Sequence, residues 1–306
     1  MPRTVNWSLF ENCCLCGKRC GVNRLKGQTG SCGLDANLVV SSFTPHFGEE
    51  PVISGVKGSG TVFFSGCNLS CCFCQNHQIS HGKCGTSYTT ELAEKKIFEL
   101  IKKKIHNINF VTPTPWIPYV LTIAEKLKKT GIITVYNTGG YDNPELLEKL
   151  DQVIDIYLPD MKYADDTLAQ KYSGIENYSL INRKLVKQMA KSKKILLDEN
   201  GLCRQGVIIR HLQLPGCLSD TLQIIDYIAD HFADEVFFSL MSQYTPCYQA
   251  PFELQKKIAP EEYEQALERV LKRGLENVFI QDLTSSGEYV PDFSRQEPFI
   301  RANTPG

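Results

Sequence analysis

Short apolar runs and longer stretches with helical spacing alternate along the chain from about residue 60 onward. The short runs are rich in β-branched and aromatic residues, as buried strands are, and the longer stretches place apolar side chains three and four residues apart, as amphipathic helices do. Strands are expected at residues 61–65, 109–112, 132–136, 153–158, 206–212, 235–240 and 277–280. Helices are expected at 90–104, 116–129, 144–150, 219–232 and 260–273, and helical material that Gly174 interrupts at 167–191. Since strands that alternate with helices pair in parallel through right-handed crossovers, the pattern predicts an α/β fold, a partial or complete parallel β/α barrel.

Residues 1–50 do not follow this alternation and are rich in cysteine. We therefore expect three parts: a cysteine-rich amino-terminal module at residues 1–50, the barrel at 51–293 and a carboxyl-terminal tail at 294–306. With 306 residues, of which 42% are apolar, the chain is long enough to bury the core of a large barrel.

Charge and hydropathy narrow the class of function. The chain has 33 Lys and Arg against 34 Asp and Glu, which argues against a surface that binds nucleic acid or acidic membranes. No apolar run approaches the roughly 18 to 20 residues of a membrane span, and the amino terminus has no apolar signal core. We expect a cytoplasmic protein, in which 13 cysteines are better interpreted as metal ligands and free thiols than as disulfides.

The loop after the first predicted strand carries Cys67, Cys71 and Cys74 in the spacing Cys-x3-Cys-x2-Cys. Three thiolates on a four-iron cluster leave one iron without a protein ligand, whereas an electron carrier normally supplies a fourth cysteine. The spacing therefore predicts a [4Fe-4S] cluster whose open iron can bind a substrate. Cys72 lies outside the spacing and is expected to be a packed or free thiol.

A zinc knuckle, a disulfide cluster or simply packed thiols are the alternatives for this loop. Zinc sites usually combine a Cys pair with a second pair of Cys or His downstream. After Cys74 the nearest candidates are only His77, His81 and Cys84, so the spacing favours the cluster.

The three-cysteine motif, with Phe73 before its last cysteine, is similar to the signature of the radical S-adenosylmethionine (radical SAM) enzymes. This resemblance implies that S-adenosylmethionine chelates the open iron and that an electron from the cluster splits it to a 5′-deoxyadenosyl radical, which abstracts hydrogen. Further segments look like the pyruvate formate-lyase activating enzyme-like group of that family, which includes such an amino-terminal cysteine module; they lie at residues 20–24, 49–55, 64–69, 155–160 and 241–246. The chain departs from this group at Pro115, where a histidine is expected.

The resemblance also points to residues that would hold the cofactor, all at the carboxyl ends of predicted strands, where a β/α barrel collects its chemistry. The D-x-K segment with Asp160 and Lys162 resembles the glycyl-radical activating branch, where these two residues help hold S-adenosylmethionine. Thr112 and Thr114 occupy the place of a Gly-Gly-Glu segment whose backbone receives the methionine amine.

Three further polar residues and one histidine complete the predicted rim. Asn137 and Thr138 could reach the ribose or simply cap a strand end, and Arg210 could serve a carboxylate or a protein substrate. His211 is more often a satisfied core histidine than a catalyst. No side chain need act as nucleophile or strong base, because the cofactor carries the chemistry.

The amino-terminal module supplies a second set of thiols, Cys13, Cys16, Cys20 and Cys32, with Cys14 as a substitute for Cys13. Four sulfurs could close a zinc site, hold a second iron-sulfur cluster that relays electrons, or stay unmetallated.

Three classes of function remain in view: a radical SAM enzyme that works with a reductant such as flavodoxin or ferredoxin and activates a glycyl-radical protein, a non-catalytic iron-sulfur electron-transfer protein, and a zinc-stabilised adaptor. The three-cysteine spacing favours the first.

Overall fold

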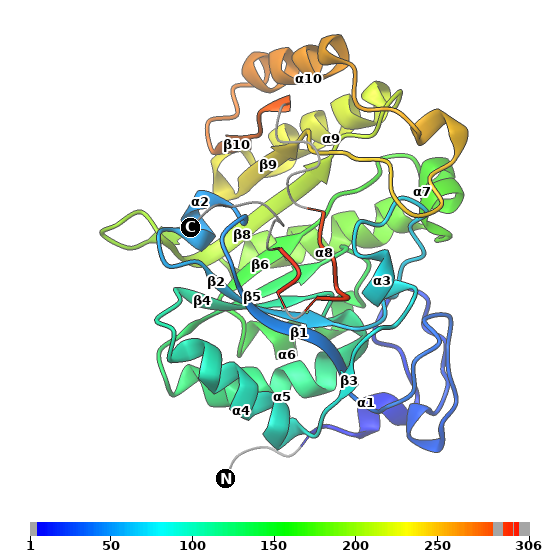
Figure 1. The fold of residues 1–306 in the computed structure, drawn as a ribbon. Helices are drawn as coiled ribbons and strands as arrows, with labels where there is room; N and C mark the ends of the chain where they lie inside the picture. Colours follow the sequence, from blue (N-terminus) through cyan, green and yellow to red (C-terminus); the bar gives the residue numbers. More distant parts are fainter. Residues whose placement is uncertain (1–4, 284–289, 296, 300–306) are drawn as a thin grey trace.

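The computed structural model describes residues 5–283, 290–295 and 297–299. Within these residues one sheet runs in the order β10-β9-β8-β6-β5-β4-β2-β1-β3, and β7 pairs with β8 beside it (Figure 1). The strands are β1 (Val39–His46), β2 (Ser59–Phe64), β3 (Thr86–Ser87), β4 (Asn107–Val111), β5 (Ile133–Thr138), β6 (Ile156–Pro159), β7 (Leu196–Leu197), β8 (Cys203–Leu212), β9 (Phe237–Met241) and β10 (Val278–Ile280).

The strands from β2 to β10 on this path pair in parallel, which confirms the predicted α/β fold. The register places Val62 beside Phe110, Phe110 beside Tyr136, and Tyr136 beside Tyr157. Neither β10 nor β3 pairs with the strand at the other end of the path, so the parallel strands form a partial barrel. All of their carboxyl ends face the same rim.

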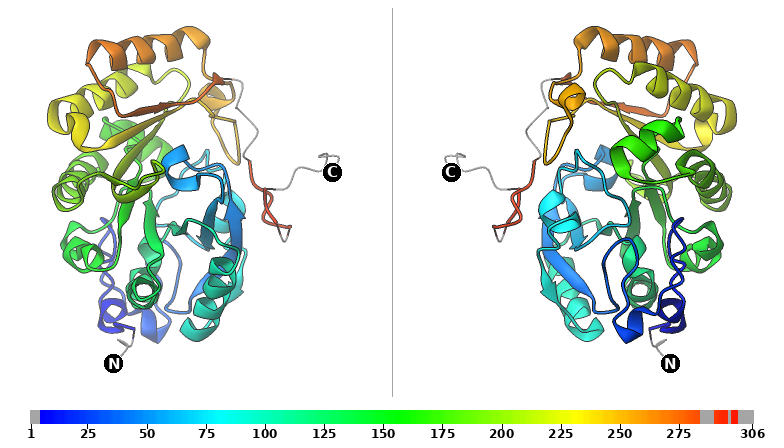
Figure 2. Two further views of the ribbon diagram at one scale, coloured as in Figure 1. Left: turned by 90° about the vertical axis from the view of Figure 1, so that its left-hand side faces the viewer. Right: turned by 90° about the vertical axis from the view of Figure 1, so that its right-hand side faces the viewer.

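Helices cover the outer face of the curved sheet (Figures 1 and 2). The longer ones are α4 (Thr90–Ile101), α5 (Ile117–Lys128), α7 (Asp166–Ser173), α8 (Tyr178–Ser192), α9 (Leu218–His231) and α10 (Pro260–Lys272). The shorter ones are α1 (Ser8–Glu11), α2 (Pro51–Ser54), α3 (His77–Ser80) and α6 (Leu147–Asp151), with 3-10 turns at Arg24–Lys26, Thr114–Trp116, Pro144–Leu146, Ala233–Glu235 and Phe252–Leu254. None of the described helices is long and apolar enough to span a membrane.

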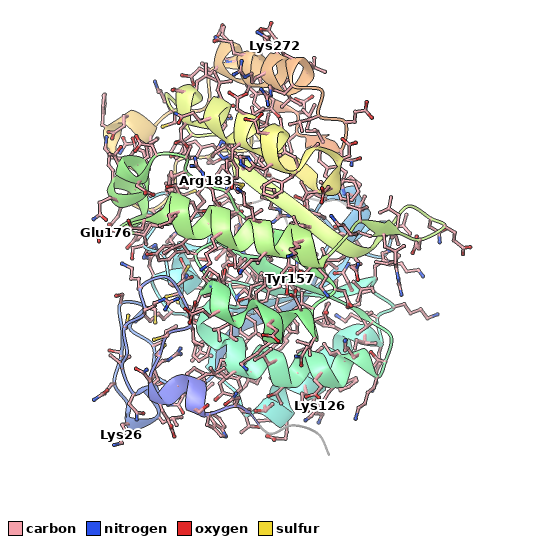
Figure 3. The ribbon with its side chains drawn as sticks, turned by 180° about the vertical axis from the view of Figure 1, so that it is seen from behind. Lys26, Lys126, Tyr157, Glu176, Arg183 and Lys272 are labelled. Carbon is pink, nitrogen blue, oxygen red and sulfur yellow. The ribbon has the colours of Figure 1, made fainter. Side chains whose placement is uncertain are left out.

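Neighbouring outer helices are joined by side-chain contacts as well as by packing. Arg183 of α8, labelled in Figure 3, lies over the ring of Tyr227 of α9, with Cζ 4.7 Å from the ring centroid, and makes a cation–π contact. Asp226 of α9 accepts hydrogen bonds from Arg269 of α10. These contacts join α8 to α9 and α9 to α10.

The amino-terminal region contributes a strand that the alternation pattern did not predict. β1 lies antiparallel to β2 and continues the sheet beyond the parallel strands. The division of the chain at residue 50 stays a prediction, although β1, on its amino-terminal side, belongs to the same sheet as the barrel strands. Part of the predicted tail at 294–306, residue 296 and residues 300–306, lies outside the described residues.

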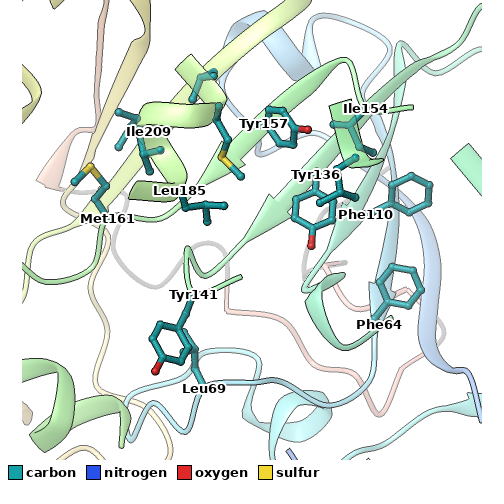
Figure 4. Close-up of a cluster of buried hydrophobic side chains, with 14 of the residues drawn as sticks. Phe64, Leu69, Phe110, Tyr136, Tyr141, Ile154, Tyr157, Met161, Leu185 and Ile209 are labelled. Carbon is teal, nitrogen blue, oxygen red and sulfur yellow. The ribbon is translucent and has the colours of Figure 1, made fainter. Parts of the chain in front are cut away.

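The main core lies between the sheet and the helices and holds large aromatic side chains such as Phe64, Phe110, Tyr136 and Tyr157 (Figure 4). The same figure shows Leu69 beside Tyr141, which places the loop after β2 against the loop after β5. In α4 the buried face is formed by Ala93, Ile97 and Leu100, whereas Leu92 is 53% exposed.

Candidate functional site

A cavity of about 640 Å³ opens at the carboxyl ends of the parallel strands. Most of the residues predicted from the sequence line it: Cys67, Cys71, Cys74, Thr112, Asn137, Thr138, Asp160, Lys162 and Arg210. Thr114 is the predicted cofactor residue that does not line this cavity. Residues far apart in the sequence thus line one cavity, as expected for the carboxyl ends of the strands in a β/α barrel.

The loop after β2 turns sharply so that its three cysteines face the cavity. Gly66 has φ 81°, a left-handed conformation that favours glycine, and a side chain there would collide with Leu34. Each thiol has a polar neighbour. The backbone N–H of Leu69 donates to Cys67 Sγ at 3.4 Å, Ser173 Oγ lies 2.9 Å from Cys71 Sγ, and Ser80 Oγ lies 3.2 Å from Cys74 Sγ.

Burial raises the pKa of all three thiols, to about 11 for Cys74. The positive charge of Lys162 acts in the opposite direction on each of them, so this lysine lies close to the whole set. Buried thiols of this kind suit iron, since binding to a metal removes the proton and neutralises the thiolate. Three thiols that line one cavity beside a buried cation are the kind of donor set that a three-cysteine cluster would use.

Asp160 and Lys162 form an ion pair inside the cavity, with Lys162 Nζ 2.6 Å from Asp160 Oδ2. Burial alone would lower the pKa of Lys162, but the charge and hydrogen bond of Asp160, together with the charges of Cys71 and Tyr178, outweigh it and the pKa is raised, so the lysine stays a cation. Tyr178 OH donates to the carbonyl of Asp160 at 3.0 Å and accepts from the N–H of Lys162 at 2.9 Å. Asn182 also donates to the Asp160 carbonyl, at 2.8 Å. Two side chains of α8 therefore hold the backbone of the D-x-K segment.

Thr112 and Thr114 have different surroundings although they are two residues apart. Thr112 lines the cavity with φ 57°, an uncommon conformation for a residue with a branched side chain, and its N–H donates to the carbonyl of Asn137 at 2.9 Å. Thr114 is buried, and its hydroxyl donates to Asp142 Oδ1 at 2.6 Å.

Asp142 is a buried carboxylate that the sequence did not single out. It accepts hydrogen bonds from Thr114, from Tyr136 OH at 2.7 Å and from Thr138. Burial raises its pKa, and the three hydroxyl donors act against that rise. The network fixes Thr138, whose hydroxyl oxygen also accepts from the N–H of Gly140 at 3.2 Å. It joins the loops that follow β4 and β5 directly beneath the cavity.

Arg210 lines the cavity, but its guanidinium is engaged by two carboxylates. Its Nε donates to Glu50 Oε1 at 2.7 Å, and its terminal nitrogen contacts both Glu50 and Glu49. Burial would raise the pKa of Glu50, yet the charge and hydrogen bonds of Arg210 outweigh it and the pKa is lowered. Glu49 also accepts from Asn109 Nδ2 at 2.8 Å. This cluster ties the segment after β1 to β8, and its two glutamates were not predicted as site residues.

His211 is buried, and both of its ring nitrogens have partners. One lies 2.7 Å from the carbonyl of Met161 and the other 2.9 Å from Thr221 Oγ1, and burial lowers the pKa to about 4. The histidine is neutral near pH 7 and supports the backbone between Asp160 and Lys162. This matches the interpretation of His211 as a satisfied core histidine.

The amino-terminal cysteines lie close to one another and near the site. Burial raises the pKa of Cys16 to about 12, and Cys13, Cys20 and Cys32 are near enough to raise it further. The carbonyl of Tyr141 accepts from the N–H of Gly17 at 3.0 Å and from Asn68 Nδ2 of the three-cysteine loop at 3.2 Å. One carbonyl thus links both cysteine-bearing segments. In the part of the chain that the structure describes, no group of three or more His, Cys, Asp or Glu is arranged to hold a metal ion.

A segment near the carboxyl terminus contacts the open side of the barrel. Phe293 and Phe299 pack against the ring of Phe63 with centroids 5.2 and 5.5 Å away, and Phe299 lies 4.2 Å from the ring of His46 and lines the cavity. Gln78 of α3 accepts from the N–H of Phe293 at 2.7 Å. The cavity is therefore bounded on this side by the chain that follows β10.

Comparison with known proteins places this arrangement in a family. Residues 61–193 match the Radical SAM superfamily. Uncharacterized protein MJ0674 of Methanocaldococcus jannaschii is 32% identical over 283 residues, a match that covers 89% of this chain and 78% of the relative. The chain carries a radical SAM domain at residues 61–193. Such a domain implies a [4Fe-4S] cluster and S-adenosylmethionine, and the three thiols and the nearby lysine would hold that pair of cofactors.

A solved structure supports the fold. SuiB of Streptococcus suis bound to S-adenosylmethionine matches with a TM-score of 0.53 and 13% identity, over 73% of this chain and 50% of SuiB. The radical SAM chain described here thus spans about half the length of SuiB. A domain of a pyruvate-formate lyase-activating enzyme from Bacteroides vulgatus matches with a TM-score of 0.40 and 14% identity, over 54% of this chain and 90% of that domain. Likeness at this level does not distinguish one branch of the superfamily from another.

Proposed function

We propose that this radical SAM protein is an enzyme that reductively cleaves S-adenosylmethionine at a [4Fe-4S] cluster held by Cys67, Cys71 and Cys74. The observation that supports it most is that these three thiols share one cavity with the Asp160–Lys162 pair at the carboxyl ends of parallel strands. When bound, the two cofactors would supply a 5′-deoxyadenosyl radical for hydrogen abstraction.

The residues of the chain have separate tasks in this proposal. Lys162 is a fixed cation beside the thiolates and suits the cofactor carboxylate, and Asp160 suits its amine or ribose hydroxyls. Thr112, Asn137 and Thr138 line the same wall and offer carbonyls and hydroxyls to the remaining polar groups. Arg210 acts through Glu49 and Glu50 and shapes the far wall. Phe299, which lines the cavity on the open side of the barrel, would help to exclude water from the site.

The test is anaerobic reconstitution with iron and sulfide, followed by dithionite and S-adenosylmethionine. We expect 5′-deoxyadenosine from the parent protein, and loss of both iron and product when Cys67, Cys71 or Cys74 is replaced by Ala. Cys72→Ala is the matched control: this thiol lies inside the motif but does not line the cavity, so the variant should keep both. An intact cluster that yields no 5′-deoxyadenosine would sink the proposal.

Within the superfamily we place the chain in the pyruvate formate-lyase activating enzyme-like group, with a glycyl-radical protein as substrate and flavodoxin or ferredoxin as reductant. Support comes from the D-x-K segment and from the family-like segments at residues 20–24 and 241–246. Incubation of the reduced enzyme with a candidate glycyl-radical protein would then give the doublet spectrum of a glycyl radical by electron paramagnetic resonance (EPR).

For the amino-terminal cysteines we propose a second metal, zinc or a further cluster. Support comes from the proximity of Cys13, Cys20 and Cys32 to Cys16, and from the link through the Tyr141 carbonyl to the three-cysteine loop. Zinc would only stabilise the module, whereas a cluster could also pass electrons to the first one. Measuring the zinc and iron content of the purified protein distinguishes a zinc site from a second cluster.

A further inference from the structure

The carboxyl end of α7 is docked on the three-cysteine loop. The N–H of Ser70 donates to the carbonyl of Ser173 at 3.0 Å, and the N–H of Cys72 donates to the carbonyl of Tyr172 at 2.9 Å. Gly174, with φ 62°, ends the helix and turns the chain away directly after Ser173. Two backbone hydrogen bonds therefore fix the position of Ser173 against the loop.

The side chain of Ser173 points at one of the cluster thiols. Its Oγ lies 2.9 Å from Cys71 Sγ, and the serine is fully buried, so water does not compete for the contact. Because a thiolate can only accept, the serine hydroxyl must be the donor whenever Cys71 binds iron.

A second hydroxyl orients the first. Tyr163 OH lies 2.7 Å from Ser173 Oγ and is also buried. With the serine proton directed at Cys71, the tyrosine is the donor to Ser173, which polarises the serine hydroxyl and strengthens its bond to sulfur. Tyr163 is the residue after Lys162, and its ring meets the ring of Tyr178 edge-on at 5.6 Å. The segment that supplies the cofactor cation thus also supplies the hydroxyl that orients Ser173.

We propose that Ser173 is a positioning residue that donates a hydrogen bond to the Cys71 thiolate and thereby raises the reduction potential of the cluster. This inference rests on the proposed function. The one-electron reduced cluster carries one more negative charge than the oxidised cluster, so a donor to a cluster thiolate stabilises the reduced form more. The electron itself comes from dithionite or a low-potential protein reductant.

The experiment is an EPR-monitored potentiometric titration of the reconstituted protein without S-adenosylmethionine. For Ser173→Ala we expect about a tenfold lower ratio of reduced to oxidised cluster at a fixed potential, which corresponds to a midpoint about 59 mV more negative for one electron. Tyr163→Phe keeps the serine and should shift the midpoint in the same direction by less. Ser173→Thr, which keeps the hydroxyl, should return toward the parent value.

The matched control is Ser179→Ala, because this serine is near in sequence but its hydroxyl bonds Asp166 on the outer side. Iron and sulfide are counted in every sample, and Tyr163→Phe carries the test if Ser173→Ala fails to hold a full cluster. Unchanged midpoints in the fully loaded Ser173→Ala and Tyr163→Phe proteins overturn the inference. A parent protein that titrates as expected but forms no 5′-deoxyadenosine contradicts the proposed function and leaves this inference standing.

Discussion

Burial decides the charge of single residues around the cavity. Lys162 keeps its proton because Asp160 compensates for burial, and Arg210 keeps its charge through Glu49 and Glu50. At His211 burial outweighs the hydrogen bond with Met161 and the charge of Asp160, and the pKa is lowered to about 4. The charged groups that remain are therefore those held in pairs, and the neutral ones serve as supports for the backbone.

The low pKa of His211 predicts a dependence of stability on pH. In the unfolded chain the histidine takes up a proton near pH 6.5, whereas in the folded protein it does so only near pH 4, so its contribution to the free energy of unfolding is lost as the pH falls between these values. From pH 7 to pH 5 this loss amounts to about 2 kcal/mol.

Urea unfolding of the metal-free protein and of His211→Gln at both pH values measures this effect. Between pH 7 and pH 5 the free energy of unfolding of the parent should fall by about 2 kcal/mol more than that of the variant. Burial raises the pKa of Asp220 to about 6, so this group stabilises the folded protein as the pH falls. Its contribution is the same in parent and variant and cancels when the two are compared. An equal pH dependence in both proteins would contradict the assignment of His211 as a buried neutral group.

At the scale of elements, the loops after β4, β5 and β6 are held together by close backbone contacts. Gly140 lies in the loop after β5 with φ 73°, and a side chain there would collide with the carbonyl oxygen of Asp160 and with Asn182. The glycine therefore allows the loop after β5 to approach the D-x-K segment after β6.

Replacing Gly140 by Ala should displace the Asp160 backbone and weaken S-adenosylmethionine binding about tenfold or more, since a misplacement of about 1 Å is costly in such a site. Gly131→Ala is the matched control, because Gly131 has nearly the same φ, 72°, but open space around it, so it carries the backbone strain of about 1 to 2 kcal/mol without the collision. The measurement is equilibrium binding of S-adenosylmethionine to both variants. Equal dissociation constants would show that Gly140 does not position the D-x-K segment for binding.

The sequence predicted the parallel strands well because each is a short β-rich run between helices. It missed β1, whose burial alternates along the strand as in a half-buried antiparallel strand. The alternation of strand and helix begins only after it. Among site residues, the cysteines follow from local spacing, and the rim residues follow from the rule on strand ends.

The missed contacts join residues that are far apart in the chain. Ser173 meets Cys71 across 102 positions, and Glu50 meets Arg210 across 160. Asp142 was missed because a single carboxylate in a loop carries no spacing signal, and only the fold brings Thr114, Tyr136 and Thr138 around it.

At the scale of the whole molecule, segments from both ends of the chain meet at the rim. Arg24 of the amino-terminal region is buried, lies over the rings of Phe10 and Trp116, and donates to the carbonyl of Pro115 at 2.7 Å. Phe293 and Phe299 pack against Phe63, and Phe299 lines the cavity. The position where a histidine was expected, Pro115, thus offers its backbone to the amino-terminal module. The amino-terminal segment is therefore joined to the loop after β4, and the carboxyl-terminal segment borders the cavity.

We propose that Cys67, Cys71 and Cys74 hold a cluster whose open iron binds S-adenosylmethionine. The most direct measurement is the EPR spectrum of the dithionite-reduced, reconstituted protein before and after S-adenosylmethionine is added. We predict that the cofactor changes the g values of the reduced cluster, because it becomes a ligand of the open iron. If a fully loaded cluster gives the same spectrum with and without saturating S-adenosylmethionine, the cofactor does not bind the open iron.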